Sequence, residues 1–179
     1  LGIRNAIAIS SGGQHSCALL EDGTVMCWGY NGDGELGDGT TESSFGEAVG
    51  VKALPENVTA IGAGWSFTCV IANGEIWCWG ENDSGQLGDG SMEQRTLPVK
   101  VVGLGAKAIS LTAGYSHACA LLEGGRVQCW GAGMQVNGTT VDRPMPMDIP
   151  DLNSGVTSIA SEVSHTCAVK STGQGLCWG

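Results

Sequence analysis

The chain has 179 residues, of which 30 are glycine and 42% are hydrophobic, and its formal net charge is −10 from 8 basic and 18 acidic side chains. Glycine that is spread evenly without a Gly-X-Y triplet excludes collagen and favours many short strands joined by tight turns. A surface this acidic repels phosphate backbones, and no run reaches the ~18 apolar residues of a membrane span, so we expect neither a nucleic-acid partner nor membrane insertion.

Four similar units follow one another along the chain at a period of about 50 residues, which is the length of one propeller blade. Each unit contains two cysteines, and a tryptophan follows the second of them. We expect a single propeller fragment over residues 1–179. Its repeats run approximately over residues 6–57, 58–105, 106–155 and 156–179, and the last repeat is incomplete.

Each unit predicts four short antiparallel strands. They are a small apolar run such as Ala6–Ser10 or Ala108–Thr112, a run with the first cysteine, a run that ends in Cys-Trp-Gly, and an outer strand such as Pro98–Val102. Helical periodicity is absent from the sequence. We therefore predict an all-β fold of β-propeller blades with four antiparallel strands each, in a partial ring of about four blades.

The two cysteines of each unit flank the turn of a predicted hairpin. Cys69 and Cys78 lie on either side of Asn73-Gly74, a preferred two-residue type I′ turn that places the cysteines directly opposite each other. In the other units the loop is one residue longer, as in the stretch that ends at Gly23, and the cysteines are one residue further apart. Directly opposed cysteines are close enough for a disulfide. We predict one disulfide in each blade: Cys17–Cys27, Cys69–Cys78, Cys119–Cys129 and Cys167–Cys177.

Disulfides imply an oxidising compartment, so we expect an extracellular or cell-surface protein. The alternative is a metal site, because His15, His117 and His165 each lie two residues before a cysteine. The sequence lacks the close Cys-x2–4-Cys pairs of zinc sites, and the second unit keeps its cysteines but has Phe67 in place of the histidine. We therefore favour disulfides and expect the histidines to be hydrogen-bonded structural residues.

The glycine-rich stretch 32–39 carries three acidic residues, Asp33, Glu35 and Asp38. Carboxylates in such a loop could bind Ca²⁺, but their spacing differs from the D-x-[DN]-x-[DN]-G pattern of calcium loops. We favour a loop that only links two strands, and we expect no cofactor.

One loop position varies between the units in a way that suggests partner binding. Four residues before the first cysteine the chain has Gly13, Trp65, Tyr115 and Val163, in the loop between the first two strands. Exposed aromatic residues on rigid loops are good interface anchors, so Trp65 and Tyr115 are the candidate partner-binding residues, with ordinary loop packing as the alternative. The tryptophans that follow the second cysteines are expected to pack between blades: Trp28, Trp79, Trp130 and Trp178.

The repeated motifs resemble the regulator of chromosome condensation repeat family, in the cysteine-rich form of its secreted bacterial members. Its most specific segment is matched by Tyr30–Thr40 (YNGDGELGDGT) and by Glu81–Ser91 (ENDSGQLGDGS). The pattern Gly-x-x-His-(Ser/Thr)-Cys-Ala-Leu is complete in the first unit and approximate in the other three, and the Cys-Trp-Gly that follows it recurs in all four units. The third unit departs from the pattern because Gly131–Thr140 lacks the Gly-Gln-Leu-Gly-Asp core, so its loop is either specialised or drifted.

The resemblance implies a seven-bladed propeller that binds other proteins. One member of the family is a nuclear exchange factor for a small GTPase, and a related secreted protein inhibits a β-lactamase with loops on one face. The sequence contains no Ser-His-Asp arrangement, phosphate loop or zinc motif. We expect a non-catalytic extracellular protein-binding or scaffold module rather than an enzyme. The alternative is an inhibitor of a partner enzyme or an exchange-factor-like regulator.

The chain begins without an initiator Met or a signal peptide, and it stops after the third strand of its last unit. We expect a piece of a longer propeller, with two alternatives: two copies complete a ring, or the open ends accept strands from neighbouring copies. The partner is then a protein or further copies of the chain itself. Three triplets match the pattern for N-glycosylation and begin at Asn57, Asn82 and Asn137.

Overall fold

The computed structural model describes residues 2–136 and 139–179 and contains four antiparallel sheets. The first sheet consists of β1 (Ala6–Ser11), β2 (His15–Leu20), β3 (Val25–Gly29) and β4 (Ser44–Gly50). The second consists of β5 (Val58–Ala63), β6 (Phe67–Ala72), β7 (Glu75–Gly80) and β8 (Arg95–Lys100). The third consists of β9 (Ala108–Ala113), β10 (His117–Leu122), β11 (Arg126–Val136) and β12 (Thr139–Asp148). The last has three strands, β13 (Val156–Ser161), β14 (Thr166–Lys170) and β15 (Gly175–Trp178).

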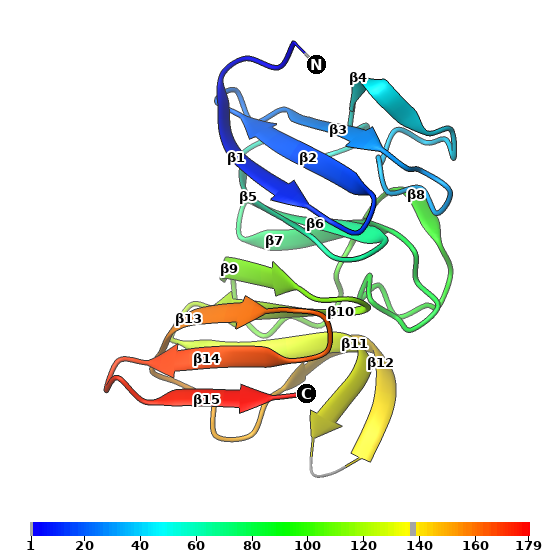
Figure 1. Ribbon diagram of the computed structural model, residues 1–179. Coiled ribbons are helices and arrows are strands. Elements are labelled where there is room, and N and C mark those ends of the chain that lie inside the picture. The colour runs from blue at the N-terminus through cyan, green and yellow to red at the C-terminus, as the bar shows by residue number, and fades with distance from the viewer. Residues whose placement is uncertain (1, 137–138) are drawn as a thin grey trace.

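The sheets lie side by side in chain order, as the blades of a partial propeller (Figure 1). In every sheet the strands follow one another from the inside outward, so the first strand of each blade is innermost. The inner strands β1, β5, β9 and β13 are neighbours of one another. The predicted all-β fold of four-stranded blades in a partial ring is therefore confirmed. Within the described residues, no helix is long and apolar enough to cross a membrane.

The four predicted disulfides are confirmed, and each joins residues that face each other across the central hairpin of a blade. Asn73 and Gly74 have φ angles of 54° and 79°, as a type I′ turn requires. Gly23 has a φ of 83°, which closes the longer loop of the first blade with a glycine in the left-handed region. The turn length therefore determines the hairpin register, and the register brings the thiols together.

The outer strand of the second blade differs slightly from the prediction, Pro98–Val102. It begins earlier, at Arg95, and ends at Lys100. Just beyond it, the Val101 N–H still donates to the Ile76 carbonyl of β7, and the Val102 N–H donates to the Gly88 carbonyl in the preceding loop. Pro98 fits this strand because β8 pairs with β7 on one side only, so an N–H on its other side is not needed.

The hydrophobic core lies between the blades, in one cluster for each pair of neighbouring blades. The indoles of Trp79 and Trp130 are fully buried in these clusters. Trp79 Nε1 donates to the Glu35 carbonyl of the preceding blade at 2.7 Å, and Trp130 Nε1 donates to the Gln86 carbonyl at 2.9 Å. These two tryptophans pack between blades as predicted, so each blade depends on its neighbour for its core.

Buried asparagines hold the long loops of the first two blades. Asn31 Oδ1 accepts the Leu36 N–H at 2.9 Å, while its Nδ2 donates to the Thr40 and Glu42 carbonyls. Asn82 makes the same contacts one blade later and is fully buried, so its glycosylation triplet is not accessible.

The third blade has a glycine at the place of these asparagines, Gly133, and therefore lacks the amide that organises the loop. The chain instead continues as a long hairpin of β11 and β12 that projects from the blade (Figure 1). The third unit therefore differs from the first two in structure as well as in sequence. Asn57 is exposed, and Asn137, which begins another glycosylation triplet, lies outside the described residues.

Candidate protein-binding site at one end of the inner strands

The loops that join the first and second strands of the blades meet at one end of the molecule and are connected by main-chain hydrogen bonds. The Gly13 N–H donates to the Trp65 carbonyl at 2.9 Å, the Trp65 N–H to the Tyr115 carbonyl at 3.2 Å, and the Tyr115 N–H to the Val163 carbonyl at 2.8 Å. The four equivalent loop residues thus form one ladder across the blades. Each residue is held on a rigid scaffold.

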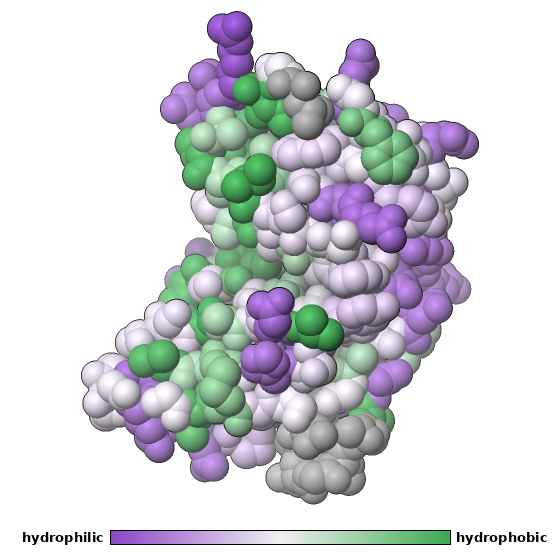
Figure 2. Space-filling model, viewed as in Figure 1, coloured by the Kyte–Doolittle hydropathy of each residue, from purple (hydrophilic) through white to green (hydrophobic). Residues whose placement is uncertain are grey.

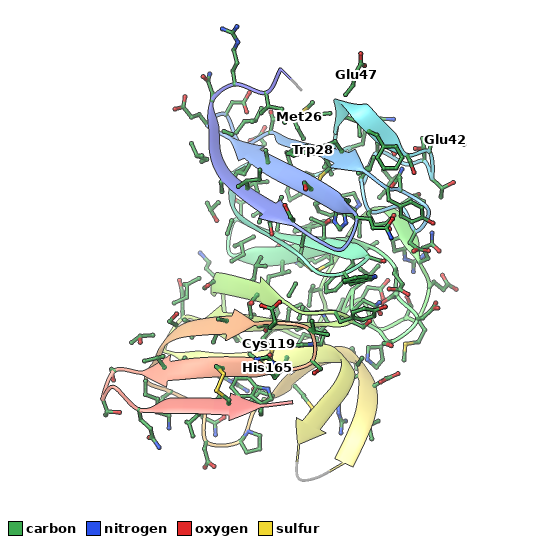
Figure 3. The ribbon with its side chains drawn as sticks, in the orientation of Figure 1. Met26, Trp28, Glu42, Glu47, Cys119 and His165 are labelled. Carbon is green, nitrogen blue, oxygen red and sulfur yellow. A yellow bond between two sulfur atoms is a disulfide. The ribbon has the colours of Figure 1, made fainter. Side chains whose placement is uncertain are left out.

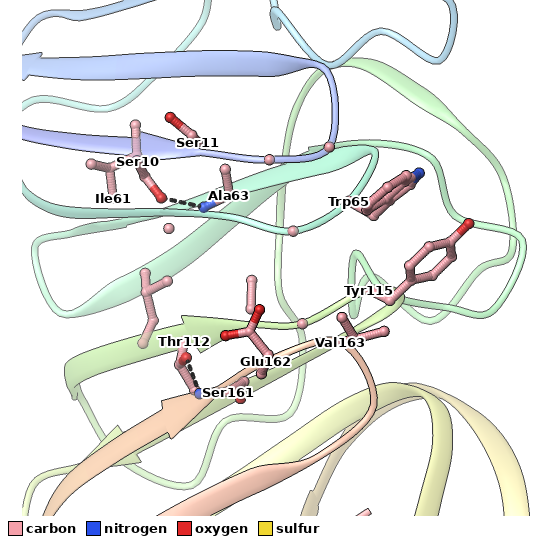
Figure 4. Close-up of a pocket in the computed structure, with 17 residues that line it drawn as sticks. Ser10, Ser11, Ile61, Ala63, Trp65, Thr112, Tyr115, Ser161, Glu162 and Val163 are labelled. Carbon is pink, nitrogen blue, oxygen red and sulfur yellow. Dashed lines mark hydrogen bonds between the residues drawn. The ribbon is translucent and has the colours of Figure 1, made fainter.

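The structure brings the two predicted partner-binding residues together. The rings of Trp65 and Tyr115 are stacked, with centroids 4.9 Å apart and planes inclined by 20° (Figure 4). Trp65 is 44% exposed, Tyr115 43% and Val163 54%, and we call these three side chains the aromatic strip. A Cβ on Gly13 would lie 2.7 Å from the Trp65 ring, so glycine at this position lets the indole lie flat. The stacking was not predicted from the sequence.

The aromatic strip borders a groove of about 510 Å³ that is lined by the inner strands and their loops. Two hydroxyl groups tie its walls together: Ser10 Oγ accepts the Ala63 N–H at 2.9 Å, and Thr112 Oγ1 accepts the Ser161 N–H at 2.8 Å (Figure 4). Glu162 supplies a carboxylate to the lining. The groove therefore offers hydroxyl groups, one acidic group and apolar surface beside two stacked rings.

Acidic loops surround the same end of the blades. The loops 30–43 and 81–94 are joined to the loops of the first two strands by the hydrogen bonds from Tyr30 N to the Gln14 carbonyl and from Glu81 N to the Ser66 carbonyl. Neither loop contains a lysine or arginine. Their acidic residues are Asp33, Glu35, Asp38, Glu42, Glu81, Asp83, Asp89 and Glu93.

Hydrophilic side chains gather along the edge of the molecule where these loops lie (Figure 2), and Glu42 projects outward from the first of them (Figure 3). The aromatic strip therefore lies beside loops with an excess of acidic side chains, of which Glu35 is buried and Asp89 and Glu93 are paired with Arg95. An excess of charge of one sign attracts partners of the opposite charge and speeds their association.

The residues considered for calcium do not converge on one point. Glu35 is buried and its Oε2 accepts the Asp33 N–H, whereas Asp38 Oδ1 accepts the N–H and the hydroxyl of Thr40. Among the described residues, no group of three His, Cys, Asp or Glu side chains could hold a metal ion. That the protein needs no cofactor stays a prediction.

The histidines are not metal ligands with the cysteines, because every cysteine is in a disulfide. His15 Nε2 shares a hydrogen bond of 2.8 Å with Thr68 Oγ1 of the next blade, and His117 Nε2 shares one of 2.9 Å with Thr166 Oγ1. Burial lowers the pKa of both imidazoles to about 4, so they are neutral at physiological pH. The predicted structural role is confirmed for these two histidines. The third, His165, is exposed.

Burial raises the pKa of Glu35 to about 7, from an ordinary value of 4.5. The folded protein therefore holds a proton that the unfolded chain releases, and the wild type loses stability as the pH rises from 4.5 to 7. We expect Glu35→Gln to raise the free energy of unfolding by about 1–3 kcal/mol at pH 8 and to change it little at pH 4. Urea unfolding at both pH values measures this difference.

In the second blade, the position of Glu35 is occupied by an uncharged amide side chain. Gln86 takes the place of Glu35, is fully buried, and its Oε1 accepts the Ser84 N–H at 2.9 Å. An amide therefore fits the same loop geometry. An equal gain in stability at both pH values would show that proton binding by Glu35 is not the cause.

Comparison with known families identifies the repeat. The family model described as "Regulator of chromosome condensation (RCC1) repeat" matches residues 22–71 and 73–121, and a second model with the same description matches residues 6–35 and 58–86.

Curated relatives match over most of this chain but over a small part of their own length. The human E3 ubiquitin-protein ligase HERC2 is 36% identical over 143 residues, which are 74% of this chain and 3% of that protein. The secretion-regulating guanine nucleotide exchange factor of Bos taurus is 33% identical over 132 residues, which are 73% of this chain and 28% of that protein. The chain thus spans less than a third of either relative.

Solved structures share the fold. Human WBSCR16 superposes with a TM-score of 0.86 at 23% identity, over 97% of this chain and 47% of that one. Yeast RCC1 (Prp20), solved with Kap60, superposes with a TM-score of 0.83 at 21% identity, over 100% of this chain and 44% of that one. The ectodomain of the receptor kinase CR4 from Physcomitrella patens superposes with a TM-score of 0.62 at 22% identity, over 97% of this chain and 41% of that one.

Proposed function

This chain belongs to the regulator of chromosome condensation (RCC1) repeat family, and from this premise we propose that it is a non-catalytic, extracellular protein-binding module. The contact surface in this proposal is the aromatic strip at the end of the inner strands. The observation that carries the proposal is the exposed stack of Trp65 on Tyr115. Tryptophan and tyrosine dominate the binding energy of protein interfaces.

The stack is well suited to binding because little of its order has to be acquired on association. Trp65 and Tyr115 are linked by one main-chain hydrogen bond, and their rings pack against each other. Side chains that are already ordered lose less conformational entropy when a partner covers them. The acidic loops beside the strip favour a partner whose contact surface is basic, because charge complementarity steers the encounter.

An extracellular setting is supported by the four disulfides, since such bonds persist in oxidising compartments. The same fold occurs in the ectodomain of the receptor kinase CR4. A second candidate function is regulation of a partner protein's activity, by inhibition or in the manner of an exchange factor. The name of the Bos taurus relative, a secretion-regulating guanine nucleotide exchange factor, favours this candidate.

The test is a double substitution, Trp65→Ala with Tyr115→Ala. A partner is captured from the extracellular medium of the native source and its affinity for the purified wild type and variant is then measured. We expect the variant to bind at least about 30-fold more weakly, the effect of losing about 2 kcal/mol at a hot spot. Its unfolding midpoint should stay close to that of the wild type because both rings are substantially exposed.

The control is Phe45→Ala, which removes an aromatic side chain that is 72% exposed on the outer strand β4. This variant should keep the wild-type affinity. The proposal would be wrong if the double variant bound as well as the wild type, or if Phe45→Ala lost as much affinity.

A further inference from the structure

The turn that joins β6 and β7 consists of an asparagine followed by a glycine. Asn73 and Gly74 adopt φ angles of 54° and 79° in this turn, and the Asn73 side chain is exposed. The other three hairpins that carry a disulfide close with different residues: Glu21-Asp22-Gly23, Glu123-Gly124-Gly125 and Ser171-Thr172-Gly173. The second blade is thus the one blade that closes its central hairpin with an asparagine.

An asparagine that precedes glycine can react with its own main chain. The Gly74 nitrogen attacks the Asn73 Cγ and loses its proton to the solvent, ammonia leaves from Cγ, and a cyclic imide remains. Water then opens the imide at one of its two carbonyl carbons. Opening at Cγ gives aspartate, whereas opening at the former main-chain carbonyl gives isoaspartate, in which the main chain runs through the side chain. Glycine favours the first step because it has no Cβ to hinder the approach of its nitrogen.

Both reacting groups are available in the folded protein. The Gly74 N–H donates no hydrogen bond to any residue that the structure describes, so no bond of this group has to break before it reacts. The Asn73 amide is held only at the surface, where its Nδ2 donates to the Glu56 carbonyl at 3.0 Å and its Oδ1 accepts from Asn57 Nδ2 at 3.1 Å. Exposed hydrogen bonds of this kind open readily. We propose that Asn73 is a site of spontaneous deamidation and isomerisation, and that Asn57 slows this reaction by restraining the Asn73 amide.

A second Asn-Gly pair, Asn31-Gly32, provides the opposite case. Asn31 is fully buried, and its amide makes hydrogen bonds of 2.9 and 3.1 Å to the main chain of its own loop. Its side chain is not free to turn toward the Gly32 nitrogen until the loop opens, so the same dipeptide should react far more slowly here. The sequence alone does not separate the two pairs. A third pair, Asn137-Gly138, lies outside the described residues.

The turn is also a point of contact between blades, so its modification has a structural consequence. The Gly74 carbonyl accepts the Ala108 N–H of the third blade at 2.8 Å, and the Asn73 side chain contacts Glu56 and Asn57 in the linker from the first blade. Isoaspartate lengthens the main chain of a two-residue turn whose type depends on fixed backbone angles. A carboxylate also lacks the N–H that donates to the Glu56 carbonyl. We therefore expect isoaspartate at position 73 to weaken these contacts and to destabilise the protein.

The test is the rate of modification at each asparagine of the purified protein. The wild type is kept in warm, mildly alkaline buffer, then reduced, digested and mapped by mass spectrometry, and isoaspartate is detected by enzymatic methylation. The same protein unfolded in urea gives the reaction time, because both Asn-Gly pairs are unrestrained there. We expect folded Asn73 to convert at least about tenfold faster than Asn31, since the buried side chain reacts only after its loop opens. The proposal would be overturned if Asn73 reacted no faster than Asn31, or stayed intact over several half-lives of the unfolded chain.

Asn57→Gly tests the restraint on the reacting amide. Glycine tolerates the left-handed φ of 59° at this position, and the change removes the amide that donates to Asn73 Oδ1. Conversion of Asn73 should become about two- to tenfold faster, the effect of losing one hydrogen bond, while conversion of Asn31 should not change. An unchanged rate at Asn73 would contradict the role of Asn57, as would an equal acceleration at both asparagines, which would indicate general destabilisation.

Asn73→Gly is the matched control for the structural consequence. A Gly-Gly pair suits the type I′ turn and does not form the imide. After equal incubation, the wild type should contain a population that unfolds at a lower urea concentration, whereas Asn73→Gly should unfold as it did before incubation. The same loss of stability in both proteins would assign it to another site and contradict the consequence expected at Asn73.

Discussion

Trp79→Ala is expected to lower the free energy of unfolding by about 3–5 kcal/mol. The indole is fully buried in the cluster between the first two blades, so its removal leaves a large cavity. The change also removes the 2.7 Å hydrogen bond to the Glu35 carbonyl, which then keeps only the longer bond of 3.3 Å from Thr68 Oγ1. Urea unfolding followed by tryptophan fluorescence and circular dichroism measures the loss.

Two further variants separate the contributions to this effect. Trp79→Phe keeps most of the apolar volume and should cost about 1–2 kcal/mol, mainly for the lost hydrogen bond. Trp28→Ala changes the equivalent residue of the first blade, which is only partly buried, and should cost clearly less than Trp79→Ala. Equal losses for Trp28→Ala and Trp79→Ala would show that contact between blades is not the source of the stability.

Replacing both Cys69 and Cys78 by alanine should lower the free energy of unfolding by at least about 2–3 kcal/mol. The bond closes a short loop with a sequence separation of 9, and both residues are fully buried in the cluster between the second and third blades. The variant thus loses a constraint on the unfolded chain and sulfur atoms that pack in the core. Urea unfolding of the oxidised proteins compares the variant with the wild type.

The matched control replaces Cys167 and Cys177 by alanine in the last blade. This bond closes a loop of nearly the same length, with a sequence separation of 10, but Cys177 is exposed and Cys167 is only partly buried. Its loss should remove the same kind of constraint on the unfolded chain but fewer packing contacts in the core. The expected loss of unfolding free energy is therefore smaller than for Cys69 and Cys78. A larger effect at the exposed pair would contradict the role given to the buried one.

The features that the sequence predicted well are those that one hairpin determines. The length of the turn at Asn73-Gly74 sets which residues lie opposite each other, so the pairing of Cys69 with Cys78 follows from local spacing. The strands, the blades and the disulfides could all be predicted from such local spacing. Each depends on residues that are close in the chain.

The features that the sequence did not predict depend on how one blade sits on the next. His15 meets Thr68 at a sequence distance of 53 residues, and Trp65 stacks on Tyr115 across 50. Neither contact follows from a repeat pattern, because the offset between blades is set by packing in the clusters between them. One signal was available in the sequence. The second blade has Phe67 in place of the histidine, and the third blade has Ala118 in place of the residue with a hydroxyl group.

The acidic loop illustrates a different limit. Asp33, Glu35 and Asp38 look alike in the sequence, yet Glu35 turns inward and the others face the surface or a turn. Spacing alone does not determine these directions. The buried Asn31 organises the loop, and its importance is visible only when it is compared with Gly133 in the third blade.

The most direct measurement of the central claim, an oxidised extracellular binding module made of disulfide-bonded blades, is the thiol content of the protein isolated from its native source. The protein is denatured and alkylated before and after reduction, and its intact mass is recorded each time. No labelled cysteine before reduction and eight after it, one for each cysteine of the chain, is the expected result. Labelling before reduction would show free thiols and would contradict both the disulfides and the proposed extracellular setting.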